Sequence, residues 1–221
     1  MPLKFKIDAD KLTPLPDNDY RQVKETFAPY VDDEILDIVM HINAGTGSVN
    51  MSRYYLLVGP KEADLSALAL CHIVEVKQQR TAAPLHYFNG LSAINRLNPA
   101  HLTVNYQRRM QRSPDLVLDE LAWRGQHWLV RSRHHAKVGI KPEHIATGKK
   151  ATLKSGFVQY AKDCGTALAL AHCRGDRRST LFEQSVCRLL PFHQKALIGA
   201  CLIYAEQVIT DTELLIDMLN D

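Results

Sequence analysis

Two runs of strand-forming residues flank a glycine-rich segment near the start of the chain, and this pattern limits the possible fold more than any other feature. The runs cover residues 34–40 and 54–58, and the segment Ala-Gly-Thr-Gly-Ser at 44–48 lies between them. Two β-rich runs with a short Gly-containing connection are typical of a β-hairpin. Because a short connection joins antiparallel neighbours, this part of the chain is predicted to form an antiparallel sheet.

Three further runs extend the predicted sheet. A helical stretch interrupts them, because Asn98 followed by Pro99 is a favourable helix start and the helical pattern continues to about Arg112. The additional strands are predicted at residues 68–77, 116–121 and 127–133. We therefore expect a sheet of about five strands with one inserted helix.

The last third of the chain is predicted to be a bundle of helices. Residues 157–174 are rich in Ala and Leu, and a second helix is expected to end at Pro191, which cannot continue a regular helix without loss of a hydrogen bond. The final helix, from about residue 192 toward 219, is apolar on most sides. A helix of that kind is normally buried, so it is predicted to be a core element.

A sheet followed by helices indicates an α+β fold. The length of 221 residues fits one domain with a single substantial core. We expect residues 1–221 to form that domain, with an N-terminal arm and helix at 1–33, a sheet-rich part at 34–148 and a helical part at 149–221.

The composition is that of an ordinary globular protein, with 46% hydrophobic and 23% charged residues and a formal net charge of +3. This charge is too small to identify a nucleic-acid or membrane protein. The N-terminus has no apolar core of a signal peptide, and no run approaches the roughly 18 apolar residues of a membrane span. The cysteines form no CxxC pair and their number is odd, so they are interpreted as reduced core residues. They are Cys71, Cys164, Cys173, Cys187 and Cys201. A cytoplasmic protein without a membrane partner is expected.

The glycine-rich segment is the strongest candidate for chemistry. Gly45, Thr46, Gly47 and Ser48 lie between two predicted strands, and Lys77 ends a neighbouring one. Glycine lets backbone N–H groups approach phosphate oxygens, and a lysine on the next strand adds a positive charge to the same site. The alternative is a plain hairpin, whose glycines serve only the turn and whose lysine is solvated.

A group of basic residues is the second candidate. Three of them are expected on one helix, where positions 108 and 112 share a face, and three on or after the last strand. They could bind phosphate, a nucleotide or a nucleic-acid backbone, or they could be solvated and paired with neighbouring carboxylates. Sparse aromatic residues make nucleic acid the less favoured partner. The residues are Arg108, Arg109, Arg112, Arg131, Arg133 and Lys137.

No catalytic residue and no metal ligand is predicted. The adjacent His134 and His135, and the His172-Cys173 pair, do not have the spacing of a zinc site. The chain contains no GxSxG, HExxH or Walker A motif, and no segment like the HRD or DFG segments of kinases.

Several short segments, in order, resemble an uncharacterised bacterial family known as domain of unknown function 2252. Each segment is weak alone, but the ordered set covers residues 35–215. The segments are Ala44 to Ser48 with Arg53-Tyr54, the strand ending at Lys77, Tyr106-Gln107-Arg108 with Met110-Gln111 and Asp115, Leu129-Val130-Arg131 with Lys137, Cys164-Gly165 through Leu170-Ala171-His172, and Tyr204-Ala205-Glu206-Gln207 with Asp211.

This resemblance implies a kinase-like fold, of which the chain would be the C-terminal part. It implies that Gly45, Gly47 and Ser48 face phosphate, that Lys77 is the strand lysine, and that Arg108 and Arg131 are further basic positions. The family's upstream Gly-Asp-x-His-x-x-Asn-Phe and acidic segments, which would supply the base and the metal ligands, do not occur here. The chain also departs from the family pattern at Gln78, where Glu is usual, and at Asn50, where a glycine is expected.

Together these observations predict a kinase-like protein that binds a nucleotide or another phosphorylated ligand, with ATP and Mg²⁺ as candidates, and does not turn it over alone. Phosphotransfer would require a separate catalytic chain, since the metal-binding carboxylates are missing. The alternatives are a protein-interaction or dimerisation module without a ligand, and a nucleic-acid backbone binder that uses the arginines.

Overall fold

The computed structural model describes residues 2–42, 50–88, 90, 98–133, 145, 156–176 and 179–220. It divides into two compact units, Met1–Ala167 and Leu168–Asp221. The first contains the sheet, the helices between residues 17 and 110 and the first part of the helix Gly156–Gly175, and the described helices of the second are the end of that helix and the helix Leu181–Asn220.

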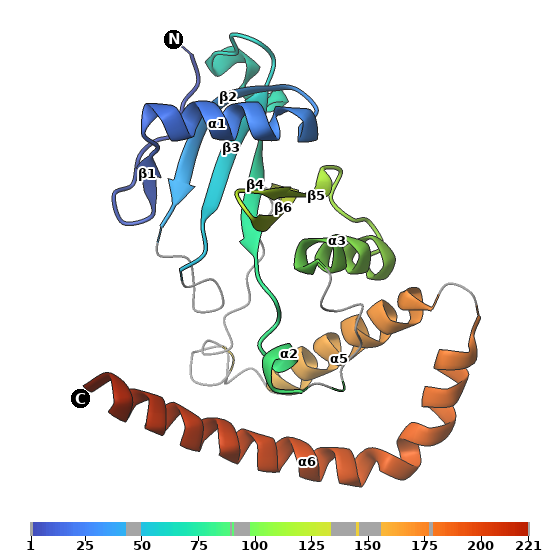
Figure 1. Ribbon diagram of the computed structural model, residues 1–221. Helices are drawn as coiled ribbons and strands as arrows, with labels where there is room; N and C mark the ends of the chain where they lie inside the picture. The colour runs from blue at the N-terminus through green and yellow to red at the C-terminus, as the bar shows by residue number, and fades with distance from the viewer. Residues whose placement is uncertain are drawn as a thin grey trace. The chain divides into compact units, whose positions relative to one another are not determined.

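Figure 1 shows the elements under the labels used below. The strands are β1 (Leu12–Pro14), β2 (Glu34–His41), β3 (Arg53–Gly59), β4 (His72–Gln79), β5 (Leu118–Trp123) and β6 (Gln126–Arg133). The helices are α1 (Asp17–Phe27), α2 (Pro84–Tyr87), α3 (Pro99–Met110), α5 (Gly156–Gly175) and α6 (Leu181–Asn220), with short 3₁₀ helices η1 (Ala28–Tyr30) and η3 (Leu65–Leu70).

The strands form one six-stranded sheet in the order β1-β2-β3-β4-β6-β5, and every neighbouring pair is antiparallel. The predicted α+β class, the antiparallel sheet and the helix inserted before its last two strands are therefore confirmed. The sixth strand, β1, was not predicted. It has only three residues and ends in Pro14, and proline is tolerated in such an edge position because no ladder hydrogen bond is needed there.

Helix α1 covers one face of the sheet (Figure 1). Its residues Val23 and Phe27 are fully buried against residues of the central strands. The Phe27 ring meets the Trp123 and Trp128 rings edge-on, with centroids 5.5 and 6.0 Å away. Aromatic pairs favour this geometry, so the three rings hold the C-terminal end of α1 against β5 and β6.

A polar contact also ties α1 to the turn between β5 and β6. Arg124 Nη2 lies 2.7 Å from Asp19 Oδ1 of α1, and its guanidinium stacks 4.4 Å from the centre of the Trp123 ring. Arg124 and Gly125 both have positive φ, 52° and 68°. A two-residue hairpin turn of that kind matches the right-handed twist of its strands.

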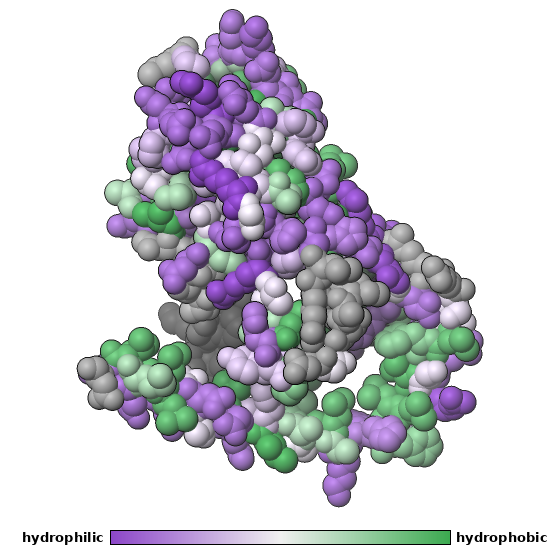
Figure 2. Space-filling view, viewed as in Figure 1, coloured by the Kyte–Doolittle hydropathy of each residue, from purple (hydrophilic) through white to green (hydrophobic). Residues whose placement is uncertain are grey.

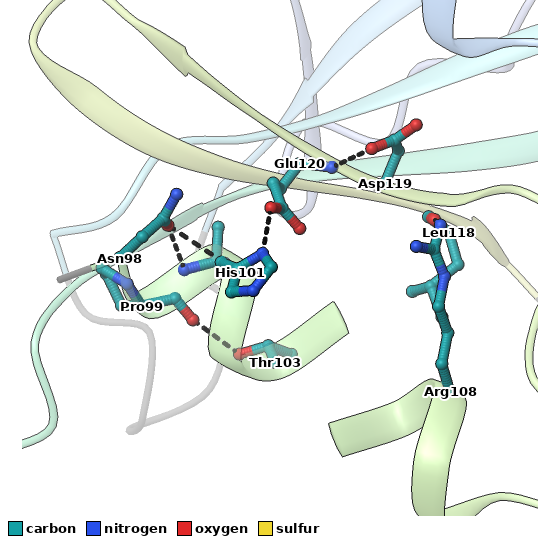
Figure 3. A network of polar contacts seen from close by, with 9 residues as sticks. Asn98, Pro99, His101, Thr103, Arg108, Leu118, Asp119 and Glu120 are labelled. Atoms are coloured by element: carbon teal, nitrogen blue, oxygen red, sulfur yellow. Dashed lines mark hydrogen bonds and ion pairs between the residues drawn. The ribbon is translucent and has the colours of Figure 1, made fainter. Parts of the chain in front are cut away.

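The other face of the sheet is covered over β5 and β6 by α3. Val104 of α3 forms a small apolar cluster with Leu118 and Leu129. Asn98 caps the helix, because its Oδ1 accepts from two backbone N–H groups in the first turn (Figure 3), and Pro99 follows at the start. The predicted helix start is confirmed, but α3 ends at Met110 and leaves Arg112 outside the helix.

In the second unit, α6 is a single helix of 40 residues with Pro191 inside it. The predicted separation at Pro191 is therefore wrong. Proline removes one N–H donor and kinks a helix, but the apolar sequence on both sides continues to favour helix, and Figure 1 shows α6 bent rather than broken.

The prediction that the final helix is a core element is also wrong, since none of the described residues of α6 is buried. Apolar residues are visible along it in Figure 2, where α6 carries much of the green surface. The second unit holds only α6 and the end of α5, which is too little surface to bury so long a helix. By length and composition alone, α6 could cross a membrane, and it is the one described helix of which this is true.

The cysteines depart from expectation in the same way. All five are free, but none is buried: Cys71 and Cys173 are half-buried, and Cys164, Cys187 and Cys201 are exposed.

The packing of α1 gives a prediction for stability. Replacement of Phe27 by Ala is expected to lower the free energy of unfolding by about 3–5 kcal/mol, because it removes a fully buried ring and leaves a cavity. Urea unfolding followed by tryptophan fluorescence measures the loss. Phe88→Ala, at a position 63% exposed, is the matched control and should change stability little. Equal effects of the two substitutions would contradict this account of the core.

Candidate functional site

The structure describes some of the predicted site residues and not others. Gly45, Thr46, Gly47 and Ser48 lie outside the described residues, as do Lys137, His134 and His135. The remaining candidates lie in the first unit: Lys77 on β4, Arg108 and Arg109 on α3, Arg112 just after α3, and Arg131 and Arg133 on β6.

Strand register brings Lys77 and Arg131 to the same face of the sheet. Lys77 is paired with Arg53 of β3, and Glu75, two residues earlier on β4, is paired with Arg131 of β6. Residues two apart on a strand, and residues directly opposite on neighbouring strands, project to one face. We call Arg53, Glu75, Lys77 and Arg131 the Glu75 cluster. It lies on the face opposite to α1, because Val74 and Val76 face the α1 core.

Glu75 is the centre of the cluster. It is the one charged residue that is buried among those the structure describes. Its Oε2 accepts hydrogen bonds from Arg131 Nε at 2.8 Å and forms an ion pair with Arg131 Nη2 at 2.7 Å, while Oε1 lies 3.3 Å from Arg53 Nη1. A buried carboxylate is tolerated only when it is paired in this way.

Lys77 has no such partner. Among the described residues none forms an ion pair with its ammonium, and Arg53 stands directly opposite on β3. Like charges opposite each other destabilise a sheet. Partial burial, and then the charge of Arg53, lower the pKa of Lys77 below its ordinary value, and the carboxylate of Glu75 offsets only part of this.

Aromatic and basic residues continue the same face beyond the cluster. The Arg133 guanidinium lies 4.5 Å from the centre of the Tyr55 ring, and the His41 ring meets the same tyrosine edge-on at 5.2 Å. Burial first, and then the charges of Arg53 and Arg133, lower the pKa of His41. A neutral imidazole next to several cations leaves the face positive at neutral pH.

A pocket of about 530 Å³ opens beside Lys77. Its described polar lining residues are Lys77, Gln79, Arg80, Thr81 and His86. Volumes of this order accommodate small-molecule ligands. Lys77 therefore belongs both to the pocket and to the Glu75 cluster.

Arg108 lies on the same side of the sheet as the Glu75 cluster, but it makes a different contact, to the residue of β5 that is paired with Arg131. Its guanidinium donates to the carbonyl of Leu118 on β5, on the α3 side of the sheet, near the contact between His101 and Glu120 (Figure 3). Since Arg112 is also outside α3, the predicted pairing of positions 108 and 112 on one helical face is wrong. Arg108 instead fixes α3 to the edge strand.

Sequence reasoning missed Arg53 and Glu75 as site residues. The alternation in Val74-Glu75-Val76-Lys77 was a usable signal, because it sends the two charged residues to one face and the two valines to the other. Arg53 and Arg131 could not be found in the same way, since their positions depend on the register of three strands. No group of three or more His, Cys, Asp or Glu residues suited to a metal occurs in the described part of the chain.

Comparison with known proteins identifies one family. The family model described as an uncharacterized protein conserved in bacteria (DUF2252) matches residues 3–217. The chain therefore belongs to this family. The match also includes the N-terminal arm and α1, which the segment-by-segment resemblance from residue 35 did not cover. No curated protein and no solved structure matches the chain.

The position of Lys77 leads to a prediction about stability and pH. Replacement by Met is expected to raise the melting temperature of the ligand-free protein near pH 7, because it removes a partly buried charge that faces Arg53. A lysine whose pKa is lowered by folding destabilises the folded state while it is charged in both states. This penalty fades as the pH rises from the folded pKa toward the unfolded value of about 10.4.

The difference in melting temperature between the Lys77→Met variant and the wild type should therefore shrink above neutral pH. Thermal unfolding at several pH values measures it, with the exposed Lys11→Met as the control. A Lys77→Met protein that is less stable than the wild type at pH 7 would show that the lysine has a stabilising partner.

Proposed function

We propose that this member of the DUF2252 family binds a phosphorylated small molecule, with nucleotides as the first class to test, at Lys77 and the adjoining Glu75 cluster. The observation that carries the proposal is the pair Arg53 and Lys77, two like charges held opposite each other beside a pocket. Such a pair lowers stability, and the carboxylate of Glu75 offsets only part of this effect, so the pair supports binding of an anionic ligand.

The chemistry of the residues favours phosphate among anions. Guanidinium groups match the geometry of phosphate oxygens with parallel hydrogen bonds, and a lysine ammonium adds a point charge. The nearby Arg80 and His86 line the same pocket and could contact a second charged or polar part of the ligand.

The finer form of the proposal follows the family resemblance. The chain would correspond to the C-terminal part of a kinase-like fold, in which Gly45, Thr46, Gly47 and Ser48 face the phosphates and ATP with Mg²⁺ is the candidate ligand. Phosphoryl transfer depends on carboxylates that hold the metal and orient the nucleophile, and the sequence has no HRD-like or DFG-like segment. The proposal is therefore binding without turnover, and phosphotransfer only together with a separate catalytic chain.

Thermal unfolding with and without millimolar ATP, ADP, GTP and adenosine, each with and without Mg²⁺, tests the proposal. A ligand at ~100 times its Kd stabilises the folded state by roughly 2.7 kcal/mol, so phosphorylated ligands should raise the melting temperature and adenosine should not. The shift should disappear in Lys77→Ala and persist in Lys11→Ala, each compared with its own ligand-free melting temperature. Absence of a shift with all phosphorylated ligands would contradict the proposal.

A second candidate function is interaction with another chain through α6. The exposed apolar side chains of this helix favour it, because a large apolar surface is normally covered by a partner. The simplest partner is a second copy of this chain.

Size-exclusion chromatography with light scattering tests this candidate. We expect an oligomer whose mass falls to that of one chain in Ile203→Glu, because a charge at the middle of the apolar surface opposes its burial. The control is Glu213→Gln on the same helix, which should leave the mass unchanged. A wild-type protein that is monomeric at micromolar concentration would contradict self-association through α6.

A further inference from the structure

Two roles are possible for Glu75, and they have opposite effects on the affinity for an anion. As a simple negative charge, it would repel an incoming phosphate and weaken binding. As an anchor, it would fix the basic side chains around it and strengthen binding. The geometry of its contacts decides between the two.

Each oxygen of the Glu75 carboxylate holds a different arginine. Oε2 takes both Nε and Nη2 of Arg131, at 2.8 and 2.7 Å, and Oε1 lies 3.3 Å from Nη1 of Arg53. Both contacts of Arg131 end on the same carboxylate oxygen, so two donors of one guanidinium hold it at that oxygen. A guanidinium has five N–H donors, so the two that Arg131 uses here leave three for another acceptor.

The exposed fraction of the side chains increases from Glu75 to Arg53 to Arg131, as expected if Glu75 lies beneath a binding surface and holds the arginines in place. The Glu75 side chain is 7% exposed, that of Arg53 is 17% exposed and that of Arg131 is 35% exposed. The carboxylate is therefore shielded from a ligand, while part of Arg131 can reach one.

The charge of the cluster also limits the ligand. The cluster contains three cationic side chains, Arg53, Lys77 and Arg131, and one carboxylate, that of Glu75. The formal charges of these four side chains sum to +2, which a phosphoryl group with two negative charges would match. A carboxylate ligand with one negative charge would match only half of this sum.

From these observations we propose that Glu75 is a positioning residue for a dianionic phosphoryl group. It holds Arg53 and Arg131 so that, with Lys77, they bind the same terminal phosphate. The inference rests on the proposed function and adds to it the two arginines, the carboxylate that orients them and the charge of the group they bind.

Calorimetric titration with pyrophosphate tests the inference, with acetate as the monoanionic comparison. The wild type should bind pyrophosphate and should not bind acetate detectably. Glu75→Gln keeps the shape of the side chain and removes its charge, so the two roles predict opposite results. Loss of a repelling charge would tighten pyrophosphate binding, whereas loss of the anchor should weaken it by about 10- to 100-fold.

Arg131→Lys provides a second variant, because it retains the positive charge and loses the fork of N–H groups. It should weaken pyrophosphate binding over the same range. Arg124→Lys, on the α1 side of the sheet, is the matched control and should leave affinity unchanged. Circular dichroism and urea unfolding establish that each variant is folded, and if Glu75→Gln does not fold, Arg131→Lys alone decides the outcome.

The possible failures are distinguishable. A wild type that binds no pyrophosphate and no nucleotide overturns both the proposed function and this inference. A wild type that binds pyrophosphate, together with folded Glu75→Gln and Arg131→Lys proteins whose affinity is unchanged or higher, overturns the positioning role alone. Equal binding of acetate and pyrophosphate overturns the requirement for a dianionic group.

Discussion

The packing of α1 onto one face of the sheet is the contact on which the rest of the first unit depends. Val23 and Phe27 are buried against the central strands, and Phe27 lies against both tryptophans of β5 and β6. Because side chains alternate along a strand, this contact decides the direction of every residue in the sheet. A shift of one residue in β4 would turn Glu75 and Lys77 into the apolar core.

The opposite face of the sheet therefore lies outside the main core and carries the charged residues of the Glu75 cluster. α3 covers its β5–β6 side through Val104, Leu118 and Leu129. A second apolar cluster, of Leu3, Leu57 and Ala63, lies at its β3 side. The remaining area over β3, β4 and β6 holds the Glu75 cluster, in which one buried carboxylate serves two arginines. A buried ion pair is weak support for stability, since desolvation of the charges costs as much as their attraction returns. Under the proposed function, the cluster serves the binding of an anion rather than the stability of the sheet.

Local signals predicted the elements of the first unit well. The hairpin pairing of β2 with β3, the helix that begins at Asn98-Pro99 and the antiparallel order all follow from short-range chemistry that neighbours in sequence supply. The three-residue strand β1 was missed because it has too few residues to show a period. The prediction that α6 is buried was wrong. An apolar sequence indicates that a helix is favoured in a buried environment, but it does not show which part of the protein, if any, packs against it.

The amino-acid sequence by itself determined the class of fold and the existence of most elements, and it indicated Lys77 and Arg131 as candidate site residues. It did not give the element boundaries, since the strand predicted at 68–77 begins only at His72, after the 3₁₀ helix η3. It could not show that Arg108 binds the Leu118 carbonyl, or that Arg53 and Glu75 belong with Lys77. Those facts depend on which strands pair and in what register, and register is fixed only when α1 and α3 bury opposite faces of one sheet. The candidate site is a product of that long-range arrangement, because its four charged residues lie on three strands and meet only when the sheet has formed.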